Sequence, residues 1–240
     1  MDQAAVGVSA IGQAVTWLND PLNWTNPDGI LVRLGEHLRL SGGALLLAVA
    51  VGWPLGISLG HRGSRAGVVV LLSNVTQALP VIALLTVLPL TFLGFGPRSV
   101  IVALAVFAVP PLGATAYTGL REVDPEVRAA ATGMGMSGWQ TLRRVELPLA
   151  VPFLASGLRT AAVQIVATAA LASAINGGGL GQIISAGFGL GIAAGGGQVL
   201  AGGLLVVVVA LTVEAAGALL QRLVTPRPLR AGRQRGVPNI

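Results

Sequence analysis

Four long stretches of this chain carry no charged residue, and they limit the folds that are open to it. The stretches cover residues 40–60, 66–97, 99–120 and 160–213. About 20 apolar residues suffice for an α-helix to cross the hydrocarbon core of a membrane. The mean hydropathy of +0.79 lies outside the range of ordinary soluble domains. The sequence therefore predicts an all-α, polytopic membrane protein.

We expect about five membrane spans, because the last charge-free stretch is long enough for one helix and part of another. The expected spans are residues 40–60, 67–93, 99–120, 149–174 and 199–220. They form one transmembrane domain, 38–224, between an N-terminal segment, 1–37, and a basic tail, 225–240. A polar segment, 121–148, separates the third and fourth spans.

The arginines indicate how the chain lies across the membrane. If the N-terminus is outside, eleven arginines fall on the cytoplasmic side, and only Arg33, Arg39 and Arg98 remain in connections on the other side. Basic residues concentrate on the cytoplasmic side of membrane proteins. We therefore expect the N-terminus outside, and the polar segment and the C-terminus in the cytoplasm.

Residue types that are absent narrow the possible functions. Cysteine is absent and His37 and His61 are the two histidines, so a metal site is not expected. The chain has no lysine, whereas a phosphate-binding loop needs one to reach the terminal phosphates of the nucleotide. No expected span holds a nucleophile with a base, and the dispersed arginines do not indicate nucleic-acid binding. We expect no catalytic residue, and any ATP hydrolysis must occur on a separate chain.

The polar segment has the pattern of two short helices joined by a tight turn. Asp124 can cap a helix that begins at Pro125, and three alanines then favour that helix. Two glycines break it, and Ser137 can cap a second helix. Residues 147–148, Leu-Pro, mark the return into the membrane. We expect a small helical projection at this point of the chain.

This segment resembles the coupling loop of the permease subunits of bacterial ATP-binding-cassette (ABC) importers. That loop has the pattern Glu-Ala-Ala, three residues, Gly, nine residues, Ile, one residue, Leu-Pro. Residues 129–131, Gly135, Val145 and 147–148 fall at these spacings. The family's glutamate is alanine here, at Ala129, and whether Glu126 replaces it stays open.

The resemblance implies the type I importer permease fold in a bacterial inner membrane. In that family the projection docks on a separate ATPase subunit, which binds ATP and magnesium. A second permease subunit, identical or related, completes the pathway, and a soluble receptor outside delivers the solute. No cofactor on the permease itself is implied. The residues that would couple to the ATPase are Glu126, Arg128, Ala129, Ala130, Ala131, Gly133, Gly135, Met136, Ser137, Leu147 and Pro148.

Within this family the chain resembles the permeases for osmoprotectants, such as glycine betaine, choline, carnitine and proline betaine. The segments that carry the resemblance are residues 76–80, 117–120, 157–161 and 177–181. Methionine permeases share the five-span plan, so methionine or another small solute is the alternative. An ion-coupled secondary transporter is a further alternative, but the spans offer few titratable groups to bind an ion.

Neutral polar side chains in the spans are expected to line the pathway, because a weakly binding lining suits a conduit that must release its solute. The candidates are Asn74, Thr76, Gln77, Thr115, Gln164, Thr168 and Asn176. The alternative is that these side chains only bridge neighbouring helices.

Arg159 and Glu214 are the charged residues deepest in the expected membrane region. An intramembrane charge normally needs a partner, and both residues fall at a similar depth, roughly 12 to 15 Å from the cytoplasmic ends of their spans. We therefore predict that they pair, within one chain or across a permease dimer. The pair would act as a structural clamp or, alternatively, in gating or solute contact.

The connection between the last two spans, residues 176–198, contains ten glycines. Glycines let backbones approach closely, so the connection can hold a short re-entrant helix that closes the pathway outside and touches the receptor. A flexible tether is the alternative. The residues of this expected gate are Gly177, Gly178, Gly179, Leu180 and Gly181.

Overall fold

The structure is a computed structural model that describes residues 3–63 and 80–225. All regular structure within these residues is helical. Among the described residues, four helices are long and apolar enough to cross a membrane. They are α3 (Ile30–Arg62), α6 (Pro97–Arg121), α9 (Leu147–Ala169) and α11 (Ile192–Val224). The expectation of an all-α, polytopic membrane protein is confirmed.

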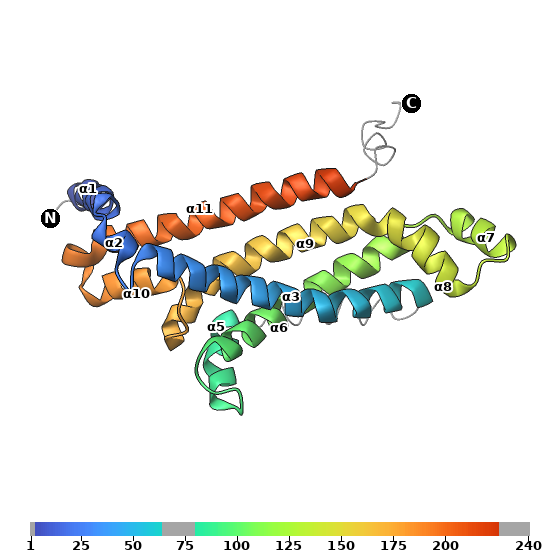
Figure 1. The fold of residues 1–240 in the computed structure, drawn as a ribbon, viewed down its shortest axis with the longest axis horizontal. Helices are drawn as coiled ribbons and strands as arrows, with labels where there is room; N and C mark the ends of the chain where they lie inside the picture. The colour runs from blue at the N-terminus through green and yellow to red at the C-terminus, as the bar shows by residue number, and fades with distance from the viewer. Residues whose placement is uncertain (1–2, 64–79, 226–240) are drawn as a thin grey trace.

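The four long helices lie lengthwise beside one another and form an elongated bundle (Figure 1). The shorter helices lie mainly at its two ends, and we name these ends by them. The α7–α8 end carries α7 (Pro125–Gly133) and α8 (Gly138–Thr141), which project beyond the bundle. The α1–α10 end carries α1 (Gln3–Asn19), α2 (Leu22–Thr25) and α10 (Gly181–Gly189). The remaining elements are α5 (Val81–Val87), 3-10 turns at Leu88–Leu90 and Ala170–Ile175, and a π-helical turn at Leu142–Glu146.

The core lies where α3, α6 and α9 meet. α6 packs against α3 on one side and against α9 on the other. Its centre is built from fully buried residues such as Ala44 and Ala48 of α3, Leu104 and Ala108 of α6, and Ile165 of α9. Small side chains let helix backbones approach closely, which is how membrane helices gain packing energy in the absence of a hydrophobic driving force.

Three glycines of α3, Gly52, Gly56 and Gly60, are spaced by four residues and lie against α6. A Cβ atom added to Gly52 would lie 2.9 Å from the carbonyl oxygen of Val109. One added to Gly56 would overlap the carbonyl oxygen of Gly113 and would lie 2.8 Å from Cβ of Ala116. The backbones of α3 and α6 therefore touch along a face that admits no side chain on α3.

Three of the expected spans correspond to helices of the structure. The third, 99–120, is α6, and the fifth, 199–220, lies within α11. The fourth, 149–174, is α9 together with the 3-10 turn that ends at Ile175. Pro148 does not interrupt this helix, because proline is tolerated in the first turn, where its missing N–H is not needed.

The first expected span, 40–60, lies within α3, but this helix begins already at Ile30. The boundary expected between residues 37 and 38 falls inside α3, and where the membrane region begins along this helix stays a prediction. The residues before the apolar stretch include Arg33 and Glu36. Their side chains are three residues apart and form an ion pair of 3.0 Å along the helix. Hydropathy alone could not detect this extension.

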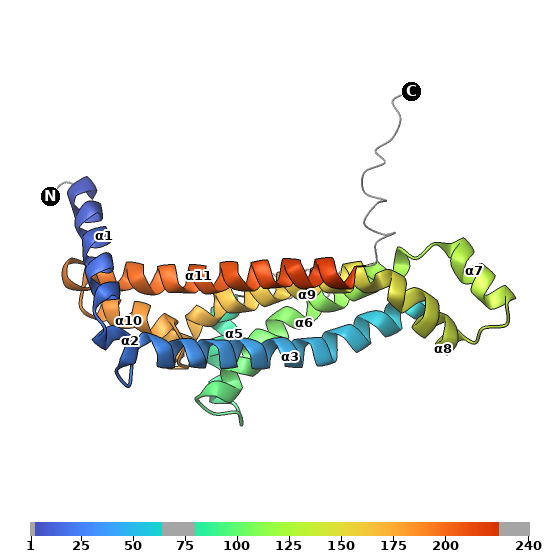
Figure 2. The same cartoon turned by 45° about the horizontal axis from the view of Figure 1, so that its top comes forward.

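The segment 1–37, for which the sequence predicted no secondary structure, contains α1 and α2. Figure 2 shows α1 lying across the bundle axis, next to the start of α11. Residues 64–79, which hold much of the second expected span, 67–93, lie outside the described residues. Its described part contains α5 and the 3-10 turn Leu88–Leu90.

A pair of matched substitutions tests the α3–α6 contact. Gly56→Ala should lower the melting temperature of the purified protein, because the new methyl group forces the two backbones apart at a cost of roughly 1 to 3 kcal/mol. Gly42→Ala, on the same helix but with open space around it, should leave the melting temperature unchanged or raise it slightly, since alanine favours a helix over glycine. Equal melting temperatures of the two variants would contradict the packing described here.

Candidate functional site

The projection at the α7–α8 end is built by the local signals that the sequence contains. The Asp124 carboxylate accepts a hydrogen bond of 2.8 Å from the backbone N–H of Glu126 and caps α7, whose first residue is Pro125. The chain turns after Gly133. Ser137 and Gln140 form a reciprocal capping box at the start of α8. The predicted pair of short helices is confirmed, and we call residues 125–141 the knob.

The knob stands clear of the bundle (Figure 1) and exposes several large apolar side chains. The exposed fraction is 72% for Met134 and 65% for Trp139, and Val127 is exposed as well. Ala129 and Ala130 are exposed beside them, whereas Ala131 packs inward. An exposed apolar surface of this kind indicates a site for another protein.

The other residues expected to couple to an ATPase surround this surface or lie at its base. Gly135 has a left-handed backbone conformation, with φ of +83°, that favours glycine. Glu126, Gly133 and Ser137 are exposed, and Met136 is half-buried. At the base, Leu147 is half-buried and Pro148 is exposed. Arg128 points back toward the bundle.

A buried carboxylate joins the knob to the bundle. Glu146 is 2% exposed, and its Oε2 atom lies 2.7 Å from Nδ1 of His61 at the end of α3. Its Oε1 atom lies 3.3 Å from Nε of Arg128 in α7. Arg128 also donates a hydrogen bond to the carbonyl oxygen of Leu120 in α6. One carboxylate thus links α7 and the π-helical turn directly to α3 and, through Arg128, to α6.

Glu146 is the last residue of the π-helical turn that joins α8 to α9. Such turns insert one residue into a helix and are frequent at functional sites. The regular hydrogen bond from residue 148 to residue 144 is unavailable in any case, because Pro148 has no N–H. Sequence reasoning did not single out Glu146, because its partner His61 is 85 residues away along the chain.

The predicted ion pair between Arg159 and Glu214 is present within one chain. Nε of Arg159 donates a hydrogen bond of 2.8 Å to Oε1 of Glu214, and a terminal nitrogen contacts the same oxygen. The other terminal nitrogen donates to Oε1 of Gln221 at 3.2 Å. The pair connects α9 to α11 and lies beside an open groove of about 450 Å³.

The expected pathway side chains that fall within residues 3–63 and 80–225 are not brought together in one place. Gln164 lines the groove beside the ion pair, but the Thr168 hydroxyl donates to the Gln164 carbonyl oxygen at 2.7 Å. The Thr115 hydroxyl likewise donates to carbonyl oxygens within α6 and packs against Gly157 of α9. Asn176 adopts a left-handed conformation and accepts a hydrogen bond from Gln182. Asn74, Thr76 and Gln77 lie outside the described residues.

The glycine-rich connection forms a short helix, α10, which packs against α11. Gly178 and Gly179, before it, have φ values of +87° and +82°. The backbone N–H of Gly179 donates a hydrogen bond of 2.8 Å to the Glu36 carboxylate of α3. Leu180 is fully buried, and a Cβ atom on Gly181 would overlap the carbonyl oxygen of Ala170. The segment is thus fixed to α3 and α9.

Gly177 and His37 are further contact residues in the interior of this region. A Cβ atom on Gly177 would lie 2.6 Å from the Val100 side chain of α6. His37 is fully buried, and its Nε2 atom lies 3.0 Å from the carbonyl oxygen of Val166. Among residues 3–63 and 80–225, no three His, Asp or Glu side chains are grouped so that they can hold a metal ion. His37 packs between α3 and α9.

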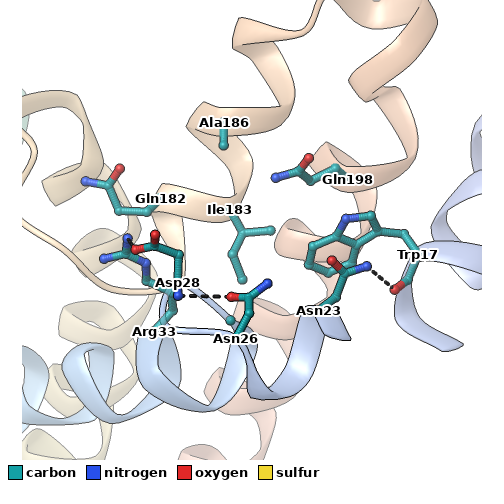
Figure 3. A pocket seen from close by; sticks show the side chains of 10 residues that line it. Trp17, Asn23, Asn26, Asp28, Arg33, Gln182, Ile183, Ala186 and Gln198 are labelled. Atoms are coloured by element: carbon teal, nitrogen blue, oxygen red, sulfur yellow. Dashed lines mark hydrogen bonds and ion pairs between the residues drawn. The ribbon is translucent and has the colours of Figure 1, made fainter. Parts of the chain in front are cut away.

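A polar cavity of about 400 Å³ opens at the α1–α10 end. Figure 3 shows the side chains of Trp17, Asp28, Gln182 and Gln198 around it, from α1, the turn before α3, α10 and α11. Asn23 donates a hydrogen bond of 2.8 Å to the carbonyl oxygen of Trp17 and so holds α1 against α2. The sequence analysis missed this cavity, because it made no prediction of secondary structure for residues 1–37.

Comparison with known proteins gives consistent results. Residues 49–226 match the family described as binding-protein-dependent transport system inner membrane component. A glycine betaine/carnitine/choline transport system permease protein of Bacillus subtilis is 36% identical over 86% of this chain and 93% of its own length. A carnitine transport permease protein of Listeria monocytogenes is 35% identical over 88% of this chain and 95% of its own length.

Solved structures agree in fold. An inward-facing structure of the MetNI methionine ABC transporter matches with a TM-score of 0.74 and 26% identity over 87% of this chain and all of that chain. An amino acid ABC transporter crystallised with histidines matches with a TM-score of 0.65 over 92% of this chain and 98% of that chain. Its identity of 17% supports the fold alone.

Glu146→Gln tests the junction below the knob. The substitution keeps the shape of the side chain but leaves Arg128 without its counter-charge, so we expect a stability loss of roughly 1 to 3 kcal/mol and a looser knob. Limited trypsin digestion should cleave after Arg128 severalfold faster than in the unmodified protein. Glu122→Gln removes a carboxylate that is exposed and should not change the rate. The same digestion rate in both variants would show that Glu146 does not hold the knob.

Proposed function

Because the chain belongs to the family of binding-protein-dependent transport system inner membrane components, we propose that it is the permease subunit of an ATP-driven importer for osmoprotectants. Relatives that transport glycine betaine, carnitine and choline are 35 to 36% identical over most of their length. These solutes share a trimethylammonium group, which is the substrate class we assign. The observation that carries the coupling part of the proposal is the apolar knob, which stands clear of the bundle at the position of the coupling loop.

The knob would dock on a separate ATPase subunit, which binds ATP and magnesium. The absence of lysine supports this division, because this chain cannot form a phosphate-binding loop. Closure of the ATPase would displace α7, and the contacts of Glu146 and Arg128 would pass the displacement to α3, α6 and α9 together. Glu126 is exposed one turn before Ala129 and is available for the polar contact that the missing glutamate would make.

The orientation follows from the arginines. Eleven of them would lie on the side of the knob or in the basic tail, so we place the α7–α8 end in the cytoplasm of a bacterium. The α1–α10 end then faces outward. There the fixed glycine segment 177–181 and α10 would form the outer gate and, with a soluble receptor, the entry for the solute. A second permease subunit would complete the pathway beside the groove between α9 and α11.

Methionine is the second candidate solute, because the methionine transporter structure is similar in fold and is 26% identical. The relatives that transport trimethylammonium compounds are more similar in sequence, so we rank methionine below them. An ion-coupled secondary transporter is not favoured, because the family to which the chain belongs is one of binding-protein-dependent transport.

The proposed function is tested by purification and reconstitution. A tagged copy taken from its native membranes should carry an ATPase of separate sequence, and the complex in proteoliposomes should take up glycine betaine or choline only with ATP and receptor. Trp139→Ala in the knob should reduce the co-purifying ATPase severalfold. Trp24→Ala, at the opposite end, should not. Uptake without an ATPase, or uptake of methionine in place of both other solutes, would refute the assignment.

The absence of native cysteines makes the orientation directly testable. Gly133 in the knob and Gly189 at the end of α10 both have open space where a side chain would extend. In intact cells, a membrane-impermeant thiol reagent should label Gly189→Cys and should label Gly133→Cys only after the membrane is opened. The reverse labelling pattern would invert the orientation and exclude the knob as the site for a cytoplasmic ATPase.

A further inference from the structure

We propose that the groove between α9 and α11 is a transit site for the trimethylammonium group of the solute, with Glu214 as its charged contact. The inference rests on the proposed function for the identity of the solute. It goes further in assigning a place inside the membrane to a ligand that a receptor would otherwise select outside. The groove is lined by Ser156, Thr160, Val163, Gln164, Ala167 and the pair of Arg159 with Glu214.

The polar residues of the groove form a stripe on α9. Ser156, Thr160 and Gln164 are spaced by four residues and therefore share one helix face. Ser156 and Thr160 are exposed, and Gln164 is half-buried. A helix face toward lipid is apolar, because polar groups in hydrocarbon are costly. This face of α9 therefore belongs to an aqueous pathway or to a partner subunit.

These side chains have hydrogen-bonding capacity to spare. Thr168, one turn further along α9, returns its hydroxyl to the helix backbone. In the described part of the chain, the side chains of Ser156, Thr160 and Gln164 make no such bond. Their hydroxyl and amide groups thus remain available to a polar ligand in the groove, such as the carboxylate of glycine betaine or the hydroxyl of choline.

Arg159 and Glu214 differ in how many of their polar atoms are bonded. All three guanidinium nitrogens of Arg159 are engaged, two by Oε1 of Glu214 and one by Gln221. The Oε2 atom of Glu214 makes no hydrogen bond among the described residues. The side chains of Arg159 and Glu214 are 35% and 37% exposed. The pair therefore offers a free carboxylate oxygen, whereas its positive partner is already occupied.

A trimethylammonium group fits this environment. It carries a dispersed positive charge and has no N–H group, so it needs no directed hydrogen bond and tolerates the apolar Val163 and Ala167 beside the carboxylate. Arg159 partly neutralises Glu214, which keeps the attraction weak. Sites along a conduction pathway must bind well enough for entry and weakly enough for release. Glu214 lies ten residues before the end of α11, which is about 15 Å of helix from the C-terminal end of α11.

The alternative role for the pair is a clamp that only holds α9 to α11. The two roles differ in their effect on solute selectivity, because choline is a cation and glycine betaine is a zwitterion. A clamp that weakens should reduce the uptake of both solutes by the same factor. A charged contact should change the ratio of choline uptake to betaine uptake. The ratio should fall when a positive charge is left in the groove and rise when a negative charge is left there.

The test measures uptake of choline and glycine betaine by the complete importer in proteoliposomes, with receptor and ATPase unchanged. Glu214→Gln leaves Arg159 as an unbalanced positive charge, so the choline-to-betaine ratio should fall roughly tenfold. Arg159→Gln leaves Glu214 as an unbalanced negative charge, so the ratio should rise. Thr212→Ala, on the same helix, removes a hydroxyl that donates to the Val208 carbonyl oxygen outside the groove lining and should leave the ratio unchanged.

A further variant keeps the test decisive if a single substitution prevents assembly. The double substitution R159Q/E214Q leaves no unpaired charge in the membrane, and it should lower the choline-to-betaine ratio below that of the unmodified importer. Unchanged ratios in the variants that assemble would overturn the transit site and leave a clamp, with the proposed function intact. If the unmodified importer took up neither solute, the proposed function itself would fail, and this inference with it.

Discussion

The carboxylate of Glu146 is the contact on which the proposed coupling depends. It is nearly fully buried, forms a hydrogen bond with His61 of α3 and an ion pair with Arg128 of α7, and Arg128 donates a hydrogen bond to the end of α6. Removing one partner of a buried charged group is strongly destabilising, so these elements are held together whenever the knob moves. A displacement of the knob is therefore passed to the ends of α3, α6 and α9 through these contacts. It does not depend on how stiff the connecting backbone is.

Helix α3 extends this connection to the opposite end of the molecule. His61 at one end contacts Glu146, and Glu36 near the other end accepts the backbone N–H of Gly179. The two residues are 25 positions apart, which is about 37 Å of α-helix. Between them, Gly52 and Gly56 hold α3 in backbone contact with α6. The proposed outer gate and the knob are thus attached to the same helix, α3.

The sequence predicted the features that depend on neighbouring residues or on the membrane as solvent. Asp124 and Ser137 cap helices because capping is local, and Arg159 meets Glu214 because two charges at one depth in hydrocarbon have few other partners. It could not predict bonds such as that of Glu36 to Gly179, which joins residues 143 positions apart. It also missed α1, which is free of charges but, at 17 residues, shorter than the roughly 20 residues of a membrane span.

The strength of the contacts changes along the molecule in a way that suits transport. At both ends, buried or charged groups bind the backbone, as Arg128 binds Leu120 and Glu36 binds Gly179. In the groove between them, the available groups are hydroxyls, an amide and a carboxylate already half-neutralised by Arg159. A site of high affinity in the membrane would slow release, because each 1.4 kcal/mol of added affinity lowers the dissociation rate about tenfold when association is unchanged. The strong hydrogen bonds and ion pairs therefore lie at the two ends, where they hold the helices together. The weaker polar groups lie in the groove that the solute would pass.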